Sequence, residues 1–324
     1  MTSRGPGTVA AYLAVYSVPM RVRFRGIDVR EGMLLRGAAG WGEFSPFWDY
    51  SVAECVPWLA AAREAADVGW PAPRRTSVAV NVTVPAVTPE QAMAVVRASN
   101  GCRTAKVKVA EPGQAEGEDV ARVEAVREAL GPGGHVRVDA NGAWELDTAV
   151  RMMRLLDTAA GGLEYVEQPC RTVEELAAVR RRVDVPVAAD ESIRRADDPL
   201  RVARLEAADI AVLKVAPLGG VAACLRTAEQ IGLPVVVSSA LETSVGIAAG
   251  LALAAALPEL PYACGLATLS LLAGDVTTTP FAVVDGALAV ARPVPDALNT
   301  VAADEAAVRR WDARLAELVA RQQP

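Results

Sequence analysis

The sequence predicts an α/β protein built as a TIM-type (β/α) barrel with an α+β capping domain. From about residue 78 onward, short runs rich in Val, Ile and Leu alternate with Ala-, Leu- and Arg-rich stretches of helical spacing. About eight such units favour a closed parallel barrel over an open sheet. Charged residues also end several of the apolar runs, at the rim where barrel enzymes carry their chemistry.

The barrel is predicted between residues 77 and 280, with each strand followed by a helix. The expected strands are 78–82, 105–109, 136–139, 163–166, 187–189, 210–214 and 235–238, with a weaker eighth run near Tyr262. The expected helices are 89–98, 117–130, 145–157, 173–181, 199–203, 220–231 and 244–256.

The cap is predicted from residues 1–76 together with a returning segment, 281–324. In that segment Asp285-Gly286 is a type I′ hairpin signal between two apolar runs. The remaining expected elements of the cap are hairpin strands at 9–15 and 32–36, a helix at 52–66, a proline-containing linker at 69–75, strands at 281–284 and 287–290, and a final helix near 304–321.

The overall composition narrows the possible partners and compartment. A net charge of −6 and a pI of about 5.1 argue against a nucleic-acid surface, since phosphate binding needs clustered Lys and Arg. Five scattered cysteines without a CxxC spacing make a poor disulfide framework and a poor zinc site, so we expect a reducing cytoplasm. Residues 1–9 lack the pattern of a secretory signal, and the most apolar run, 245–257, is too short to span a bilayer. We expect no nucleic-acid or membrane partner, while monomer and homo-oligomer both stay open.

Six charged residues are predicted to lie together at the C-terminal rim of the barrel. Consecutive ones are separated by roughly one strand-and-helix unit, which places them at similar heights on neighbouring strands. A single charged residue at a strand end is usually solvated, but a set in register is typical of a functional site. The six are Lys106 and Lys108 in AKVKVA, Asp139 in VRVDANG, Glu167 in YVEQP, Asp190 in VAADES and Lys214 in AVLKVAP.

The three carboxylates predict a metal site. Asp139, Glu167 and Asp190 would repel one another in a buried rim unless they were paired or bound to a cation. Because all these ligands are oxygens, Mg²⁺ or Mn²⁺ is favoured over zinc.

Lysines are expected on two sides of that metal. Lys106 and Lys108 are two residues apart on one strand and therefore point to the same side, whereas Lys214 lies four strands further on, at the far wall. A substrate carboxylate on the metal would present its α-carbon between them. The pattern thus predicts a small-molecule carboxylate substrate with one ammonium or amine on each face of its α-carbon.

These motifs resemble, one by one and in order, those of the muconate-lactonising-enzyme subgroup of the enolase superfamily. The matching motifs are KVK, VDANGAW, EQP, ADES and the later LK, and the resemblance extends over most of the chain, cap included. The resemblance implies an enolase-superfamily architecture with Asp139, Glu167 and Asp190 as metal ligands. It further implies Lys108 as the acid/base, Lys106 as its neighbour, and Lys214 as the lysine on the opposite face.

Within the subgroup, the cap loop GWGEFSPFWDYS and the segment SSALETSVG resemble those of o-succinylbenzoate synthases. That resemblance implies a Mg-dependent loss of water that yields 2-succinylbenzoate in menaquinone biosynthesis. The Asp-x-Asp pair of dipeptide epimerases is missing from YACGLAT. Expected substrate contacts are Asn141, Ser238, Ser239 and Trp48, although the serines could instead cap the following helix and Trp48 could serve only in packing.

Three other functions stay open at this point. An N-succinylamino acid racemase, or another racemase or cycloisomerase of the subgroup, would use the same lysines. A Schiff-base aldolase would need one buried lysine, but the three carboxylates in register argue against it. A catalytically inactive barrel used as a binding scaffold is disfavoured by the complete acid and base set. The single histidine, His135, precedes a strand and is expected at the surface.

Overall fold

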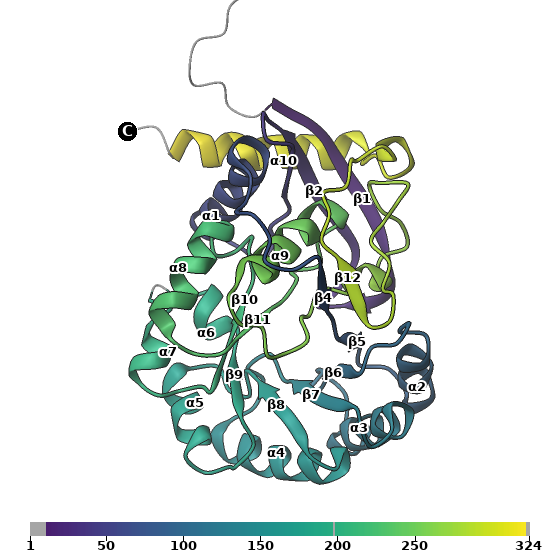
Figure 1. The fold of residues 1–324 in the computed structure, drawn as a ribbon, viewed down its shortest axis with the longest axis vertical. Coiled ribbons are helices and arrows are strands. Elements are labelled where there is room, and N and C mark those ends of the chain that lie inside the picture. The colour runs from purple at the N-terminus through teal and green to yellow at the C-terminus, as the bar shows by residue number, and fades with distance from the viewer. Residues whose placement is uncertain (1–10, 197, 322–324) are drawn as a thin grey trace, which may run out of the picture.

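The computed structural model describes residues 11–196 and 198–321 (Figure 1). The strand expected at 9–15 therefore lies partly, and the stretch 1–9 wholly, outside the described residues. Two layers are visible: an antiparallel sheet with α1 and the C-terminal helix α10 at one end, and a ring of strands and helices below it.

The cap sheet is larger than the sequence predicted. β1 (Ala11–Phe24), β2 (Ile27–Arg36) and β3 (Trp41–Phe44) form an antiparallel meander. The β1–β2 turn places Arg25 and Gly26 at φ 51° and 73°, the left-handed pair that a tight hairpin requires. The long strands carry the hairpin tip away from the cap core toward the barrel mouth.

Two helices complete the cap. α1 (Val52–Arg63) begins with a capping box in which Ser51 and Glu54 satisfy each other's backbone amides, and it continues into a π-helical turn, Glu64–Val68. α10 (Glu305–Arg321) packs against α1, where Trp58 and Trp311 are fully buried. The predicted helices at 52–66 and 304–321 are therefore present, with the first changing its hydrogen-bond pattern after Arg63.

The barrel sheet consists of seven parallel strands and closes through a short eighth segment. Cys264 bridges to Val80, and Gly265 bridges to Ser238 beyond the seventh strand. The weak eighth run near Tyr262 thus supplies two residues of pairing rather than a full strand. The seven strands, in sheet order, are β5 (Val82–Val84), β6 (Thr104–Lys108), β7 (His135–Asp139), β8 (Leu163–Glu167), β9 (Val187–Ala189), β10 (Ile210–Leu213) and β11 (Val235–Val237).

Helices surround this sheet close to their predicted positions. One turn of helix directly after β9, α6, was not predicted, and it carries Arg194 beside the rim. The helices are α2 (Pro89–Arg97), α3 (Glu116–Leu130), α4 (Leu146–Ala160), α5 (Val173–Arg180), α6 (Glu191–Arg194), α7 (Arg201–Arg204), α8 (Val221–Ile231) and α9 (Ser244–Ala256), with short 3₁₀ turns at Thr268–Leu271 and Leu298–Thr300. Among the described residues, none of the helices combines the length and the apolar character needed to cross a bilayer.

The run predicted as one strand at 78–82 is divided between two sheets. β4 (Ser77–Ala79) pairs with β12 (Ala287–Ala289), and the barrel strand β5 begins only at Val82. The predicted turn is present, since Asp285 and Gly286 have φ 49° and 74°. Across this turn only Val284 pairs with Ala287, as an isolated bridge, so residues 281–284 do not form the full second hairpin strand that was predicted.

Candidate active site

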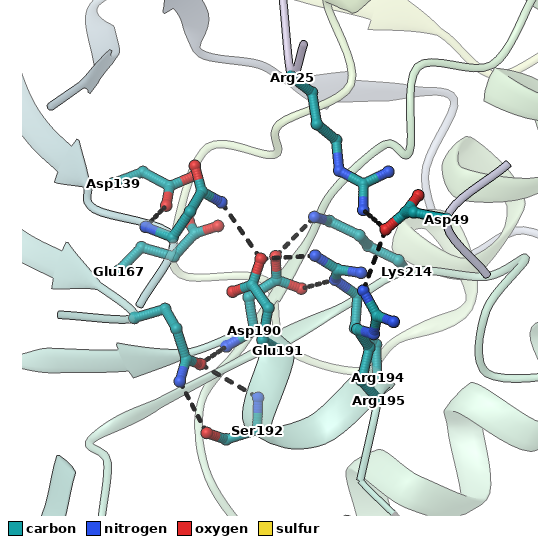
Figure 2. Close-up of polar contacts among 12 residues, drawn as sticks. Arg25, Asp49, Asp139, Glu167, Asp190, Glu191, Ser192, Arg194, Arg195 and Lys214 are labelled. Atoms are coloured by element: carbon teal, nitrogen blue, oxygen red, sulfur yellow. Dashed lines mark hydrogen bonds and ion pairs between the residues drawn. The ribbon is translucent and has the colours of Figure 1, made fainter. Parts of the chain in front are cut away.

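Parallel register brings the predicted acidic residues to one level of the barrel rim. Asp139 at the end of β7 is paired directly with Lys108 on one side and Glu167 on the other. Asp190 follows β9 and lies two residues beyond Ala188, the partner of Glu167. Their side chains are buried, at 1%, 0% and 0% exposure for Asp139, Glu167 and Asp190, and Figure 2 shows them converging from neighbouring strands.

Each carboxylate is paired with a lysine. Lys106 Nζ lies 2.9 Å from Glu167 Oε1 and 3.4 Å from Asp139 Oδ2. Lys108 Nζ lies 2.5 Å from Asp139 Oδ2, and Lys214 Nζ lies 2.6 Å from Asp190 Oδ2. The structure therefore brings together all six charged residues that the sequence singled out.

Asn141 and Glu191 extend this network. Asn141 accepts a hydrogen bond from Lys108 Nζ at 2.7 Å through Oδ1 and donates through Nδ2 to Glu191 Oε1 at 3.2 Å. Its backbone is left-handed at φ 48°, a conformation that Asn tolerates better than most residues. Asn141 thus lies beside Lys108, in contact with the predicted acid/base.

Arg194 is a site residue that the sequence interpretation missed. It projects from α6 with Nε 2.9 Å from Asp190 Oδ1 and Nη2 2.5 Å from Glu191 Oε1, and it also donates to the hydroxyl of Tyr50 in the cap. Although burial alone raises the pKa of Asp190, the charges of Arg194 and Lys214 lower it to about 2. The spacing of four residues from Asp190 was the available signal, because i,i+4 neighbours meet on one helical turn.

Gln168 of the EQP motif positions the next strand end. Its Oε1 accepts from the backbone amides of Asp190 at 3.0 Å and Ser192 at 3.1 Å, while its Nε2 donates to Ser192 Oγ at 2.7 Å. Gln168 itself has φ 41°. A fully buried amide whose oxygen and nitrogen are both hydrogen-bonded fixes the orientation of the peptide that carries Asp190.

The carboxylates have the chemistry and crowding of a cation site. Burial and the nearby charge of Asp139 raise the pKa of Glu167 to about 7, although Lys106 partly opposes them. Oε2 of Glu191 is buried and has no hydrogen-bond partner. These crowded oxygen donors suit a hard divalent cation.

In their present orientations, however, no three Asp, Glu, His or Cys side chains within 11–196 and 198–321 form a group that could hold a metal ion. Each of the three predicted ligands is turned toward an ammonium or guanidinium group instead. Metal binding therefore requires Asp139, Glu167 and Asp190 to exchange such contacts for the cation.

A cavity of about 660 Å³ opens above this cluster, between the barrel and the cap. Its lining includes the three lysines, Asn141, Ser238 and Ser239, together with Arg25 and Phe47 of the cap. A larger, mainly apolar cavity of about 880 Å³ lies between α2 and residues 266–283, but it contains none of the six rim residues. The smaller cavity is therefore the candidate active site.

The two serines line the cavity and neither one caps the following helix. α9 is capped by Thr243, whose side chain accepts from the amide of Val245. Ser239 Oγ instead donates to Glu242 Oε2 at 2.7 Å and accepts from the amide of Leu241 at 2.8 Å. Of the two open interpretations, the capping one is therefore wrong.

Trp48 is not brought to the cavity. Its ring packs 4.9 Å from that of Trp311, its indole nitrogen donates to Glu31 at 3.3 Å, and the residue is 48% exposed. The neighbouring Phe47, at 6% exposure, lines the cavity instead. His135 lies at the surface, as predicted, with its side chain 58% exposed.

The fold and the rim together define the class of protein. A family model described as enolase C-terminal domain-like matches residues 88–298, and one described as enolase N-terminal domain-like matches residues 15–66. The class is therefore the enolase superfamily, as the resemblance of the motifs implied.

The relatives narrow this class further. The chain is 67% identical over 301 residues to the o-succinylbenzoate synthase of Thermobifida fusca, covering 93% of this chain and 94% of that protein. It is 59% identical over 301 residues to the o-succinylbenzoate synthase of Mycolicibacterium smegmatis, covering 92% of each. The chain belongs to this o-succinylbenzoate synthase family of the enolase superfamily.

Solved structures share the fold at much lower identity. The L-Ala-D/L-Glu epimerase from Bacillus subtilis has a TM-score of 0.73 at 23% identity and covers 89% of this chain and 97% of its own. The muconate lactonizing enzyme from Pseudomonas putida has a TM-score of 0.75 at 20% identity and covers 91% and 99%. An N-succinyl Arg/Lys racemase from Bacillus cereus has a TM-score of 0.75 at 19% identity and covers 92% and 99%. These likenesses concern the architecture.

Proposed function

We propose that this protein is an o-succinylbenzoate synthase, a hydro-lyase that dehydrates 2-succinyl-6-hydroxy-2,4-cyclohexadiene-1-carboxylate to 2-succinylbenzoate in menaquinone biosynthesis. The observation that carries the proposal is the placement of Lys108 and Lys214 at one buried carboxylate cluster, in a chain 67% identical to a named o-succinylbenzoate synthase. The five cysteines are all free and buried, which suits the proposed cytoplasmic location.

Asp139, Glu167 and Asp190 are the residues that would hold a divalent cation, Mg²⁺ or Mn²⁺. The support for this role is their oxygen-only chemistry, their burial, and the raised pKa of Glu167 beside two other carboxylates. When bound, such a cation supplies positive charge next to the substrate carboxylate as its α-proton leaves.

The chain's own side chains perform the proton transfers. Neutral Lys108 takes the α-proton through Nζ, breaking the C–H bond, and then returns this proton to the departing hydroxyl as the C–O bond breaks and water leaves. The electron pair left by the proton completes the aromatic ring. Lys106 holds Glu167 in place, with Nζ 2.9 Å from Oε1.

Lys214 contributes charge from the opposite wall. It is buried at 9% exposure and paired with Asp190, so a cationic side chain at this position opposes the negative charge that develops on the substrate. Asn141 contacts Lys108, while Ser238 and Ser239 line the part of the cavity assigned here to the succinyl group.

The test is a continuous assay of 2-succinylbenzoate formation, run beside a racemisation assay on N-succinyl amino acids. The proposal predicts metal-dependent dehydration as the faster reaction. Racemisation without dehydration would make the protein an N-succinylamino acid racemase instead. Borohydride trapping of a lysine adduct with a carbonyl substrate would point to a Schiff-base enzyme.

A further inference from the structure

The loop between β11 and α9 contains a strained residue at the active-site cavity. Leu241 lines the cavity and has φ 63°, in the left-handed region that non-glycine residues adopt at a cost. The side chain is 3% exposed, so both the backbone and the side chain of Leu241 shape the wall beside Ser238 and Ser239.

Arg30 of the cap holds this strained backbone. It lies on β2, is 2% exposed, and donates through Nε to the carbonyl of Leu241 at 2.8 Å and through Nη2 to the carbonyl of Ala240 at 3.3 Å. Nη2 also donates to the carbonyl of Ser45. One buried guanidinium therefore joins two consecutive peptides of the loop to the cap, across 211 residues of sequence for the Leu241 contact.

Glu43 holds the other end of the same loop. It lies on β3, is 6% exposed, and accepts hydrogen bonds from the amides of Thr243 at 3.1 Å and Gly246 at 3.0 Å. A carboxylate at this point satisfies amides of the first turn of α9 and complements its dipole. Tyr16 and Ser45 donate to the opposite oxygen of Glu43 at 2.6 and 2.8 Å, which fixes the carboxylate within the cap.

We infer that Arg30 and Glu43 are positioning residues, through which the cap holds the loop 239–243 in the strained conformation that forms the substrate pocket. The guanidinium of Arg30 donates to two carbonyls of the loop, and the carboxylate of Glu43 accepts from amides where the loop enters α9. The loop is therefore held at two points by side chains of opposite charge. This inference rests on the proposed function in assigning that pocket to the succinyl group. The holding of the loop itself rests on the contacts alone.

The first measurement is hydrogen exchange of peptides covering residues 238–246, which does not depend on any substrate. Arg30→Met removes the donors while retaining an unbranched apolar chain, and it should increase exchange in these peptides. Arg36→Met is the matched control, because Arg36 lies on the same strand but is exposed; it should leave exchange unchanged. Arg30→Lys keeps the charge with a compact donor group in place of the guanidinium fork and should give an intermediate result.

The second measurement distinguishes positioning of the loop by Arg30 from a general role of Arg30 in attaching the cap to the barrel. Leu241→Ala and Leu241→Gly both remove the side chain, but only glycine removes the left-handed strain. In the wild-type and Leu241→Ala backgrounds, Arg30→Met should raise KM about tenfold with a smaller change in kcat. The left-handed backbone at residue 241 costs a non-glycine residue roughly 1.4 kcal/mol, and without the hydrogen bonds from Arg30 nothing offsets this cost. In the Leu241→Gly background the same substitution should raise KM by less than about threefold.

Unchanged loop exchange in Arg30→Met, or an equal KM effect in the glycine and alanine backgrounds, would overturn the positioning role. Faster exchange with an unchanged KM would also overturn it, because the loop would then be held without consequence for the substrate. If the wild-type protein formed no 2-succinylbenzoate, the proposed function would fail, and the exchange data would still decide whether the cap holds the loop.

Discussion

Lys108 Nζ lies 2.5 Å from Asp139 Oδ2, so the residue assigned to proton transfer is joined to a residue assigned to metal binding. An ammonium engaged in this ion pair cannot accept a proton. The ammonium must therefore lose its proton to solvent before Lys108 acts as a base, and a divalent cation that takes over Asp139 would remove the carboxylate that stabilises the charged form. Metal binding and the activation of Lys108 as a base are therefore linked.

Metal removal should abolish turnover. Excess EDTA is expected to reduce the dehydration rate to background, and added Mg²⁺ or Mn²⁺ should restore it, since the three buried carboxylates are the proposed ligands. Asp139→Asn, which keeps the shape but removes the charge, should weaken metal binding by about tenfold or more. Unchanged turnover under chelation would contradict the metal assignment.

The cap loop should show different effects at two adjacent aromatic residues. Phe47→Leu should raise KM by about tenfold, because Phe47 lines the cavity. Trp48→Ala should leave KM unchanged and lower the free energy of unfolding by about 1 kcal/mol, since its ring packs on Trp311. Steady-state kinetics and chemical denaturation measure the two effects. A KM increase in Trp48→Ala alone would return Trp48 to the substrate site.

Glu64 should contribute to the attachment of the cap. Its carboxylate accepts from the amides of Val221 at 2.6 Å and Ala222 at 3.0 Å, and so satisfies the first turn of α8 from outside the barrel. Glu64→Ala should lower the free energy of unfolding by about 1 kcal/mol, as loss of a helix cap does. Glu317→Ala, in an exposed ion pair with Arg321, is the control and should change it by less than about 0.5 kcal/mol. Equal effects would show that Glu64 has no capping role.

Much of the barrel followed from local pattern. Periodicity located most helices to within a few residues, and the apolar runs located most strands, because the barrel strands are largely buried on both faces and most of the helices on one. Regular spacing then placed Lys108, Asp139 and Glu167 in register, as the strand pairing confirms. Parallel strands of similar length leave little freedom in the height of their C-terminal ends.

Contacts between segments that are distant in the sequence could not be predicted from the local pattern of residues. The bond from Arg30 to Leu241 and that from Glu43 to Thr243 connect residues 211 and 200 positions apart. No local propensity encodes such contacts, because they arise only when the cap is docked on the barrel. Val78 was likewise assigned to the barrel sheet, although it pairs with Leu288 of the C-terminal segment. Its apolar side chain is equally suited to either sheet.

The most direct test compares Lys108→Arg with Lys214→Arg in the dehydration and racemisation assays. Arginine carries the charge of lysine but, with a pKa above about 12, cannot accept a proton at neutral pH. If Lys108 alone transfers protons in dehydration, Lys108→Arg should lower the dehydration rate by about a thousandfold. Lys214→Arg should retain part of the dehydration rate and lose any racemisation. Loss of dehydration to background in both variants would contradict the assignment of Lys108 as the single acid/base.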